Sequence, residues 1–505
     1  MHGATDTRNE ATIVTDPDLL VLREGDNVGV LTADRPGIAR GHKVALVDIE
    51  PGTQIRKYGQ SIGVASARIR AGSHVHTHNV RMDDAERRHE LGGVHHEQPA
   101  PDGERPTFLG YRRANGRVGT RNYIGIVTSV NCSASTARMI AAQFPQSVLA
   151  PHPHIDGVMA LTHTSGCGLV LQSEGAQTLE RTLRGYAEHP NFAGILVLGL
   201  GCEMLQVSSF VNALELSGDT VLEHLTIQES GGVRASVRAG VEAITRMLDR
   251  VNDVQREPCD VSELVLGLNC GGSDGYSGIT ANPALGWASD LLVSYGGRSV
   301  LAETPEVFGA EHLLTRRAVS PEVAQALLDR IEWWQRYAEA GGGTLDNNPS
   351  PGNKAGGLTT ILEKSLGAVA KAGQSDLAAV YRYAERIDTP GLGFMDTPGY
   401  DPVSVTGLIA GGATVICFTT GRGSVLGGKP SPSIKLATNT ELYERQREDI
   451  DIDCGRIIDG TATLAELGQE IFDRILRVAS GERSVSEELD LGQDEFVPWQ
   501  LGTVT

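Results

Sequence analysis

Short apolar runs that resemble β-strands alternate with helical segments along the chain from residue 107 onward. The clearest runs are YIGIVTSV, GILVLGL, LVLGL and TVICFTT, and segments of helical periodicity lie between them. Strands that are connected by helices lie parallel in one sheet, so this alternation predicts an α/β core with parallel strands. The polar, Pro-containing stretch 249–264 marks a boundary between an α/β unit at 107–258 and a second unit, rich in Gly loops, at 259–505.

The first part of the chain has a different sequence pattern. Residues 13–80 contain β-branched or alternating runs such as KVALVDI and SIGVASARI, which are separated by Gly, Pro and Asp turns. No long helical pattern intervenes, so we predict a small all-β domain at 1–82. Residues 83–106 are charged, contain Pro and Gly and have almost no apolar content, which is typical of an inter-domain linker.

The composition limits the kinds of partner. The 505 residues include 44 basic and 63 acidic side chains, and the net charge is −19. Nucleic acids and anionic membranes attract basic surfaces, so the expected partner is a small molecule, and self-association into a homo-oligomer stays open. The polar N-terminus lacks the apolar core of a signal peptide, and no apolar run approaches the ~20 residues of a membrane span. We therefore expect a cytoplasmic protein.

Three histidines alternate in the segment GSHVHTHN at 72–79. Residues i, i+2 and i+4 of a strand share one face, so His74, His76 and His78 are predicted to project to the same side. Imidazole is a common metal ligand, which makes the triplet a candidate site for a divalent metal. Alternate positions of one strand do not converge ideally on one ion, so two ligands are an alternative. A solvated strand end beside the linker is the structural alternative.

Four of the seven cysteines lie at or near the ends of strand-like runs: Cys132, Cys167, Cys202 and Cys270. Ligands bind beyond the carboxyl ends of parallel strands, so these thiols could converge on one cleft. Soft sulfur ligands favour iron or zinc, and the set is a candidate iron site that includes an iron–sulfur cluster. The alternative is core packing, because Cys is often buried and no CxxC motif is present.

Gly-rich polar loops are the third feature. They occupy 270–275, 278–283, 348–357 and 420–423. Backbone N–H groups in such loops bind carboxylates, and a guanidinium grips a carboxylate with two hydrogen bonds. Turns without a ligand are the structural alternative for each loop alone. The polar side chains that these loops contribute as binding candidates are Ser273, Asp274, Thr280, Asn282, Asn353, Lys354 and Arg422.

The histidines are unevenly distributed. Eleven of fourteen lie at or before His163, and none follows His312. A general base from the C-terminal unit must therefore be a lysine or a carboxylate. No GxSxG motif is present, which argues against an α/β-hydrolase. The candidate bases in the C-terminal unit are Asp274, Glu303, Lys354, Glu363 and Lys364.

Long segments of the chain resemble the altronate/galactarate dehydratase family of sugar-acid hydro-lyases. The matching motifs include RGHKVALVDI, HVHTHN, YRRANGRVGTRN, HTSGCG, GLGCE, CGGSDGYSGITANP, NPSPGNKAGG and TTGRG, and they extend from about residue 20 to 500. The resemblance implies an N-terminal SAF-type β domain followed by a two-part lyase core. It also implies dehydration of a sugar acid to a 2-keto-3-deoxy acid with a divalent metal, typically Fe²⁺ and alternatively Mn²⁺.

Altronate dehydratase is the branch that the His triplet and the C-terminal half resemble most. We accordingly predict that His74, His76 and His78 bind the metal, with the four cysteines as an alternative iron site. Arg422 and the 348–357 backbone would hold the carboxylate, Lys354 or His163 would move protons, and Asp274 and Asn282 would contact hydroxyl groups or a metal. Galactarate dehydration, a carbon–sulfur lyase acting on sulfolactate and a non-catalytic sugar-acid binding protein are the alternatives.

Overall fold

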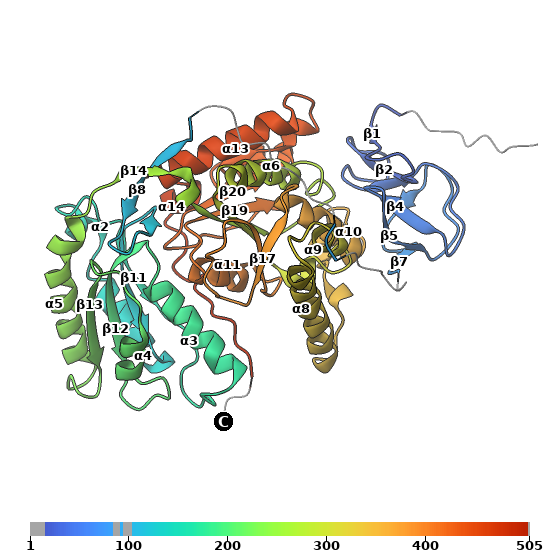
Figure 1. The fold of residues 1–505 in the computed structure, drawn as a ribbon. Coiled ribbons are helices and arrows are strands. Elements are labelled where there is room, and N and C mark those ends of the chain that lie inside the picture. Colours follow the sequence, from blue (N-terminus) through green and yellow to red (C-terminus); the bar gives the residue numbers. More distant parts are fainter. Residues whose placement is uncertain (1–15, 84–90, 94–103, 503–505) are drawn as a thin grey trace, which may run out of the picture.

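The computed structural model describes residues 16–83, 91–93 and 104–502. These residues form an N-terminal β domain, a second domain around a four-stranded sheet and a C-terminal domain around a seven-stranded sheet. The C-terminal domain lies between the other two (Figure 1). The prediction of a small β domain followed by an α/β core is confirmed. Most of the predicted linker, at 84–90 and 94–103, lies outside the described residues.

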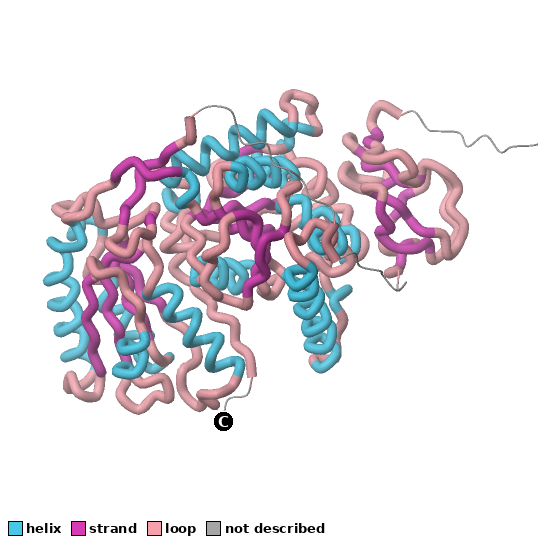
Figure 2. Tube along the Cα trace, viewed as in Figure 1, coloured by secondary structure: helices cyan, strands magenta, loops and turns pink. Residues whose placement is uncertain are grey.

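The N-terminal β domain contains short antiparallel strands joined by long loops (Figure 2). One sheet has the order β1-β2-β3-β6 and the other has the order β4-β5-β7. Its buried aliphatic side chains, such as Val28, Ile55 and Val75, belong to the same apolar core as those of the C-terminal domain. The domain is therefore packed onto its neighbour. Its strands are β1 (Leu19–Leu20), β2 (Val28–Leu31), β3 (Lys43–Ala45), β4 (Gln54–Lys57), β5 (Gln60–Ala65), β6 (His74–Val75) and β7 (Val80–Arg81).

The second domain is a parallel sheet in the order β11-β10-β12-β13 with helices on both faces. All residues of β10 and β12 are buried, as expected for the inner strands of a sheet that is covered on both sides. Helix α3 packs against α11 of the C-terminal domain. The strands are β10 (Tyr123–Thr128), β11 (Gly157–Leu161), β12 (Phe192–Gly199) and β13 (Val221–Thr226), and the helices are α1 (Ala134–Ala141), α2 (Gln146–Leu149), α3 (Glu174–Ala187), α4 (Val207–Ala213) and α5 (Val233–Asn252).

The polar stretch at the predicted boundary is more ordered than a loop. Helix α5 continues to Asn252, and β14 (Glu257–Asp260) then pairs antiparallel with β8 (Thr107–Arg112). Strand β9 (Val118–Gly119) completes this small sheet on the other side of β8. The pairing places the two ends of the second domain next to each other, where the C-terminal domain begins.

The C-terminal domain is a parallel sheet in the order β17-β18-β16-β15-β19-β20-β21. The chain leaves the central strand β15 first toward β16 and later continues at β19 on the other side. Such a switch point opens a crevice at the carboxyl ends of the strands, where ligands bind in open α/β sheets. The strands are β15 (Val265–Cys270), β16 (Arg298–Leu301), β17 (Leu377–Tyr381), β18 (Gly391–Met395), β19 (Val415–Thr420), β20 (Ser433–Ala437) and β21 (Ile452–Asp453).

Helices cover both faces of this sheet, and several short ones carry the loops at its carboxyl edge (Figure 1). Helix α6 follows β15 and packs against α13, while α10 packs against β5 of the N-terminal β domain. The helices are α6 (Ala281–Ser294), α7 (His312–Thr315), α8 (Pro321–Ala340), α9 (Pro351–Ala355), α10 (Ile361–Val369), α11 (Asp401–Ala410), α12 (Thr440–Arg445), α13 (Leu464–Ala479) and α14 (Val485–Glu488). In the described part of the chain, every helix is too short or too polar to cross a membrane.

Candidate active site

Three histidines of the N-terminal β domain form a compact group, which we call the histidine group: His42, His74 and His76. One ring nitrogen from each lies within 4.8 Å of the others. His42 Nδ1 and His74 Nε2 are 3.0 Å apart, and the rings of His74 and His76 are stacked with centroids 5.2 Å apart. Such spacing allows three imidazoles to bind one metal ion.

Antiparallel pairing and a turn create this group. His42 directly precedes β3, and His74 begins β6, which pairs with β3. The chain then turns, because the backbone N–H groups of Asn79 and Val80 both donate to the carbonyl of His76. The side chain of Asn79 fixes the turn by accepting from His76 N at 2.9 Å and donating to His74 O at 2.9 Å.

The structure groups two members of the predicted triplet, His74 and His76, with His42, and metal binding by the triplet stays a prediction. A continuous strand would have put His78 on the same face, but β6 ends at Val75, and His78 is exposed and outside the histidine group. His42 takes its place, and sequence reasoning missed it because it lies 32 residues before His74. The pairing of the KVA strand with the HV strand was the signal that could have revealed it.

The three imidazoles are neutral at pH 7. Burial, followed by the positive charge of neighbouring groups, lowers the pKa of His74 and of His76 to about 4, and burial also lowers the pKa of His42. His76 Nδ1 is buried and has no hydrogen-bond partner among the described residues. A buried nitrogen without a partner is costly, and a cation bound between neutral imidazoles would use it. The histidine group thus fits a divalent metal.

Two buried lysines fasten the N-terminal β domain to the C-terminal domain. Lys43 Nζ and Lys57 Nζ lie 2.8 and 2.9 Å from the two carboxylate oxygens of Glu363 on α10, and all three side chains are almost completely buried. Lys43 also donates to the carbonyl of Gly357 at 2.6 Å. Glu363, a candidate base from the sequence, is thus held in an ion triplet, and its pKa is lowered despite burial because two ammonium groups face it.

The histidine group consequently rests on the Gly-rich loop 348–357. His42 Nε2 lies 3.2 Å from the carbonyl oxygen of Ala355. Gly357 has φ = +103°, and a Cβ there would lie 2.4 Å from the carbonyl of Gly41, so only glycine allows this contact. Lys354 on α9, directly before Ala355, is half-buried, and its ammonium group makes no hydrogen bond or ion pair with the residues that the structure describes.

A second group of potential ligands lies at the carboxyl ends of β15 and β16. Cys270, Glu303 and Glu306 bring one ligand atom each within 4.8 Å of one another, and all are buried. Lys371 Nζ lies 2.7 Å from Cys270 Sγ and 3.2 Å from Glu303 Oε2. Lys364 Nζ lies 2.6 Å from Glu306 Oε1. We call these five residues the lysine-paired group.

The lysine-paired group combines an unfavourable backbone conformation with shifted pKa values. Glu303 has φ = +74°, a left-handed conformation that is costly for a residue with a side chain. Burial and the charge of Glu306 raise the pKa of Glu303, whereas Lys364 and Lys371 hold the pKa of Glu306 below its ordinary value. Burial and Glu306 also raise the pKa of the nearby Asp401 to about 6. Perturbed carboxyls at a strand edge are typical of functional sites.

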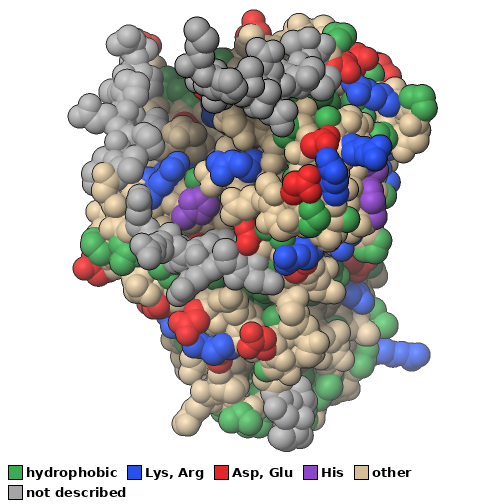
Figure 3. All heavy atoms as spheres, turned by 90° about the vertical axis from the view of Figure 1, so that its right-hand side faces the viewer, with side chains coloured by type: hydrophobic (Ala, Val, Ile, Leu, Met, Phe, Trp, Pro, Cys, Tyr) green, Lys and Arg blue, Asp and Glu red, His purple; other side chains and the backbone are tan. Residues whose placement is uncertain are grey.

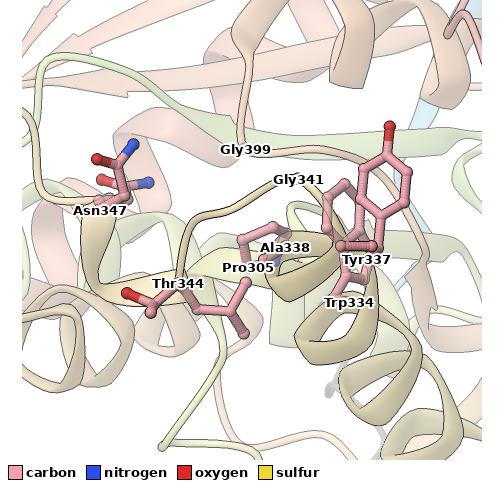
Figure 4. Close-up of a pocket in the computed structure, with 11 residues that line it drawn as sticks. Pro305, Trp334, Tyr337, Ala338, Gly341, Thr344, Asn347 and Gly399 are labelled. Atoms are coloured by element: carbon pink, nitrogen blue, oxygen red, sulfur yellow. The ribbon is translucent and has the colours of Figure 1, made fainter.

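A pocket of about 550 Å³ opens beside the lysine-paired group. Trp334 and Tyr337 of α8 line one side, and Thr344 and Asn347 line the other, as Figure 4 shows. Asn348 also lines the pocket, and its side chain joins it to the buried charges by donating to Glu306 Oε1 at 2.9 Å and accepting from Lys364 at 2.9 Å. Loop 348–357 therefore reaches from this pocket to the histidine group.

Several predicted binding residues have other roles in the structure. Asp274 is buried and accepts hydrogen bonds from Ser277, Thr438 and Asn439. Asn282 bonds to Gly367 and Thr419, and Thr280 donates to Thr438 at 2.7 Å. Because protein partners occupy these polar atoms, Asp274, Thr280 and Asn282 hold the loops together rather than presenting free groups to a ligand.

The other loop residues lie nearer the crevice. The side chain of Asn353 caps α9 and donates to the carbonyl of Ser273 at 2.9 Å, which joins loop 348–357 to loop 270–275. Arg422 is exposed and packs beside Gly272. The structure thus brings Arg422, Ser273, Asn353 and Lys354 to one edge of the C-terminal sheet.

His163 lies elsewhere, in the second domain. Its Nε2 is 2.9 Å from the carbonyl of Thr128, and its Nδ1 accepts from Ser165 N at 3.2 Å. Both ring nitrogens contact the backbone and burial lowers the pKa of His163, so the side chain stabilises a loop, and its role in proton transfer stays a prediction. The predicted four-cysteine site is also divided, because Cys270 is buried in the lysine-paired group while Cys132, Cys167 and Cys202 are exposed.

Charged side chains of both signs mix on the face that carries the N-terminal β domain (Figure 3). Basic side chains on this face do not gather in one patch among the described residues, in keeping with the chain's net charge of −19.

Family models match the chain in three consecutive segments. The SAF domain of altronate/galactarate dehydratase matches residues 11–83, the second domain of D-galactarate dehydratase/altronate hydrolase matches 110–252, and the C-terminal domain of D-galactarate/altronate dehydratase matches 261–504.

Whole proteins match over similar lengths. Altronate dehydratase of Escherichia coli is 39% identical over 474 residues, which cover 93% of this chain and 94% of that protein. Galactarate dehydratase (L-threo-forming) of the same organism is 40% identical over 487 residues, which cover 95% of this chain and 92% of that protein. The β subunit of (2R)-sulfolactate sulfo-lyase of Chromohalobacter salexigens is 35% identical over 400 residues, which cover 78% of this chain and 97% of that subunit.

The fold and these matches define the class: the chain is a multidomain enzyme, a hydro-lyase that acts on sugar acids. It belongs to the altronate/galactarate dehydratase family, and its N-terminal β domain is the SAF domain of that family.

Proposed function

We propose that this chain dehydrates an aldonate of the altronate type to a 2-keto-3-deoxy acid with a divalent metal, Fe²⁺ or alternatively Mn²⁺, held by His42, His74 and His76. The observation that carries the metal site is the arrangement of three neutral imidazoles within 4.8 Å, one of which has a buried nitrogen without a partner in the described structure. Their position against loop 348–357 connects the metal to the crevice of the C-terminal sheet.

The chemistry requires stabilisation of negative charge. Removing the proton α to a carboxylate builds up a dianion, and the β-hydroxyl must then leave. A metal bound at the histidine group would supply Lewis-acid stabilisation of this charge. The protein must supply a cation for the carboxylate and a base within hydrogen-bond reach of the α-proton.

Lys354 and Arg422 are the residues to which we assign these tasks. Arg422 is exposed at the end of β19, where its guanidinium can grip a carboxylate with two hydrogen bonds. Lys354 precedes the carbonyl that contacts His42, and its side-chain nitrogen has no partner among the described residues. In its neutral amine form it can accept the α-proton, and in its protonated form it can return a proton to the leaving hydroxide. Ser273 and Asn353 would orient the hydroxyl groups through the joined loops.

An aldonate fits these assignments better than an aldarate. Galactarate carries a carboxylate at each end, so it needs a second cation, whereas the proposal uses Arg422 for one carboxylate and Lys354 for proton transfer. Galactarate dehydration is nevertheless the second candidate, because a galactarate dehydratase is 40% identical to this chain. A sulfolactate lyase is a more distant candidate, supported by the 35% identical β subunit.

A substrate panel tests the proposal. The protein is loaded anaerobically with Fe²⁺ or Mn²⁺ and incubated with altronate, galactarate and sulfolactate, and 2-keto-3-deoxy acids and sulfite are measured. We expect the 2-keto-3-deoxy product from altronate, with kcat/KM at least ~10-fold above that for galactarate, the equivalent of about 1.4 kcal/mol. Turnover of galactarate alone would overturn the substrate assignment, and equal activity without any metal would overturn the metal assignment.

A further inference from the structure

Three exposed cysteines lie at one edge of the second domain. Cys132, Cys167 and Cys202 are exposed, whereas the other four cysteines of the chain are buried. Cys259, Cys417 and Cys454 belong to the apolar core and Cys270 lies in the lysine-paired group, whereas exposed thiols do not agree with core packing. The three exposed ones follow β10, β11 and β12, which are neighbours in the sheet. Because these strands are parallel, all three thiols lie at the carboxyl edge, where α/β sheets bind ligands.

Hydrogen bonds hold the three cysteine loops together. The backbone N–H of Asn131, next to Cys132, donates to the carbonyl of Ser165 at 2.9 Å, and Met204 N donates to the carbonyl of Gly166, next to Cys167, at 3.3 Å. The loop with Cys167 therefore contacts both of the others. Gly166 has φ = +101°, and a Cβ there would lie 2.4 Å from the carbonyl of Ser129, so the approach requires glycine.

Glu203 joins the loop with Cys132 directly to the loop with Cys202. Its carboxylate accepts from Ser129 Oγ at 2.7 Å and from the backbone N–H of Gly201 at 2.6 Å. The positions of Cys132 and Cys202 are thus fixed relative to each other by a buried side chain.

The surroundings suit thiolate ligands of a cluster. Cys132 lies in the 3-10 turn Asn131–Ser133, which leads directly into α1. Met204 and Leu171 expose apolar side chains close in sequence to Cys202 and Cys167, at 43% and 50% exposure. An apolar border limits water at a metal cluster.

We propose that Cys132, Cys167 and Cys202 hold an iron–sulfur cluster with three protein thiolates. Among the described residues these thiols do not form a group within 4.8 Å, the spacing that a single ion requires. The sulfide bridges of a cluster span a wider set of thiolates, and soft sulfur ligands select iron. Three thiolates on a [4Fe–4S] cluster leave one iron without a protein ligand, open to a small oxygen ligand. This inference goes beyond the proposed function and does not depend on it.

Anaerobic reconstitution with equal amounts of Fe²⁺ and Fe³⁺ and with sulfide tests this site. We expect about four irons and four acid-labile sulfides per chain from the cluster, broad visible absorbance and an EPR signal after reduction. Each of Cys132→Ser, Cys167→Ser and Cys202→Ser should lower the bound sulfide at least ~10-fold, which corresponds to about 1.4 kcal/mol. Cys259→Ser, which changes a buried cysteine at the domain boundary, is the matched control and should keep the sulfide.

A double variant separates this site from the proposed function. His74→Ala with His76→Ala should keep the sulfide and the visible absorbance, although it loses the metal of the histidine group. Alkylation of the wild-type protein needs no variant: the three thiols should be protected after reconstitution and reactive before it. Wild-type protein that binds no sulfide, binds only a single metal ion at these thiols, or leaves all three thiols reactive after reconstitution would overturn the inference.

Discussion

The histidine group and the lysine-paired group satisfy the same geometric condition for metal binding, yet they differ in what surrounds the ligand atoms. Both bring three such atoms within 4.8 Å. Around Cys270, Glu303 and Glu306, the ammonium groups of Lys371 and Lys364 lie 2.6 to 3.2 Å from the ligand atoms. Around the imidazoles, the described residues place no ammonium group within hydrogen-bond distance of a ring nitrogen, although Lys43 is near enough to help lower the pKa values, and His76 Nδ1 has no partner.

This difference shows that spacing alone does not define a metal site. In the lysine-paired group the cations are part of the protein, so the acidic groups are already compensated and a metal would have to displace buried ammonium groups. In the histidine group the potential ligands are neutral ring nitrogens, so a metal could bind there without displacing a charged group. This contrast supports our proposal that the metal binds at the histidine group, whereas the lysine-paired group forms an ion-pair network beside the pocket.

The largest effect is expected for the metal. His42→Ala removes one of three ligands, and a metal contributes several kcal/mol to the stabilisation of developing charge. We expect kcat/KM for dehydration to fall by about 10³-fold, or about 4 kcal/mol. Steady-state kinetics with saturating Fe²⁺ measure this loss. His78→Ala is the matched control and should stay within about 3-fold of the wild type, which is below 1 kcal/mol.

The largest change in the free energy of unfolding is expected when the buried ion triplet between the SAF domain and the C-terminal domain is broken. Glu363→Ala leaves Lys43 and Lys57 buried without their carboxylate, and such removal of one partner costs about 3–5 kcal/mol. Urea denaturation measures the change, and limited proteolysis shows whether the SAF domain detaches. Glu441→Ala, which removes an exposed partner of Arg40 at the same interface, is the control and should change stability by less than about 1 kcal/mol. Equal effects of both changes would contradict the role given to the buried triplet.

A slightly smaller effect is expected in the lysine-paired group. Lys371→Met removes the cation beside Cys270 and Glu303, and we expect a loss of about 3 kcal/mol in the free energy of unfolding. Glu303→Gln in the same chain should restore part of this loss, because it removes the uncompensated charge. Thermal and urea unfolding of the two single variants and the double variant measure the coupling. Strictly additive effects would show that the two side chains do not form one network.

The histidine group and Asp401, which lies near the lysine-paired group, should respond to pH in opposite directions. The pKa of Asp401 is raised to about 6, so the folded state keeps a proton that the unfolded state has lost, and this contribution to stability falls as the pH rises from about 4 to 6. The pKa values of His74 and His76 are lowered to about 4, so their contribution is present above about 6.5 and is lost as the pH falls toward 4.

Urea unfolding of the metal-free protein between pH 4 and 7 measures how the free energy of unfolding depends on pH. Asp401→Asn should remove a decrease of about 1–3 kcal/mol over this range, and His74→Asn should flatten the rise in the same interval. A wild-type pH profile that neither variant changes would show that these shifted groups do not govern stability.

The sequence allowed the order of domains and the nature of the core to be predicted, because strand-like runs such as 265–270 and 415–420 are recognisable from composition alone. The carboxyl-edge placement of Cys270 and Arg422 followed from parallel topology. His74 and His76 were found because they lie close together in the sequence.

Other parts of the site depend on contacts that no local pattern contains. His42 joins the histidine group through the pairing of two strands far apart in the sequence, and His78 leaves it through a turn fixed by Asn79. Asp274 looked like a ligand because it is polar and lies in a Gly-rich loop, but Thr438 and Asn439 occupy its carboxylate. Lys371 was missed because its partners Cys270 and Glu303 are distant in the chain.

Metal content of anaerobically loaded protein is the measurement that tests the central contrast most directly. It is made on the wild type, His42→Ala, His78→Ala and Cys270→Ser after removal of loosely bound iron and without added sulfide. The account predicts about one Fe²⁺ per chain in the wild type, in His78→Ala and in Cys270→Ser, and at least ~10-fold less in His42→Ala. Full metal content in His42→Ala together with loss in Cys270→Ser would contradict it, because the metal would then lie in the lysine-paired group.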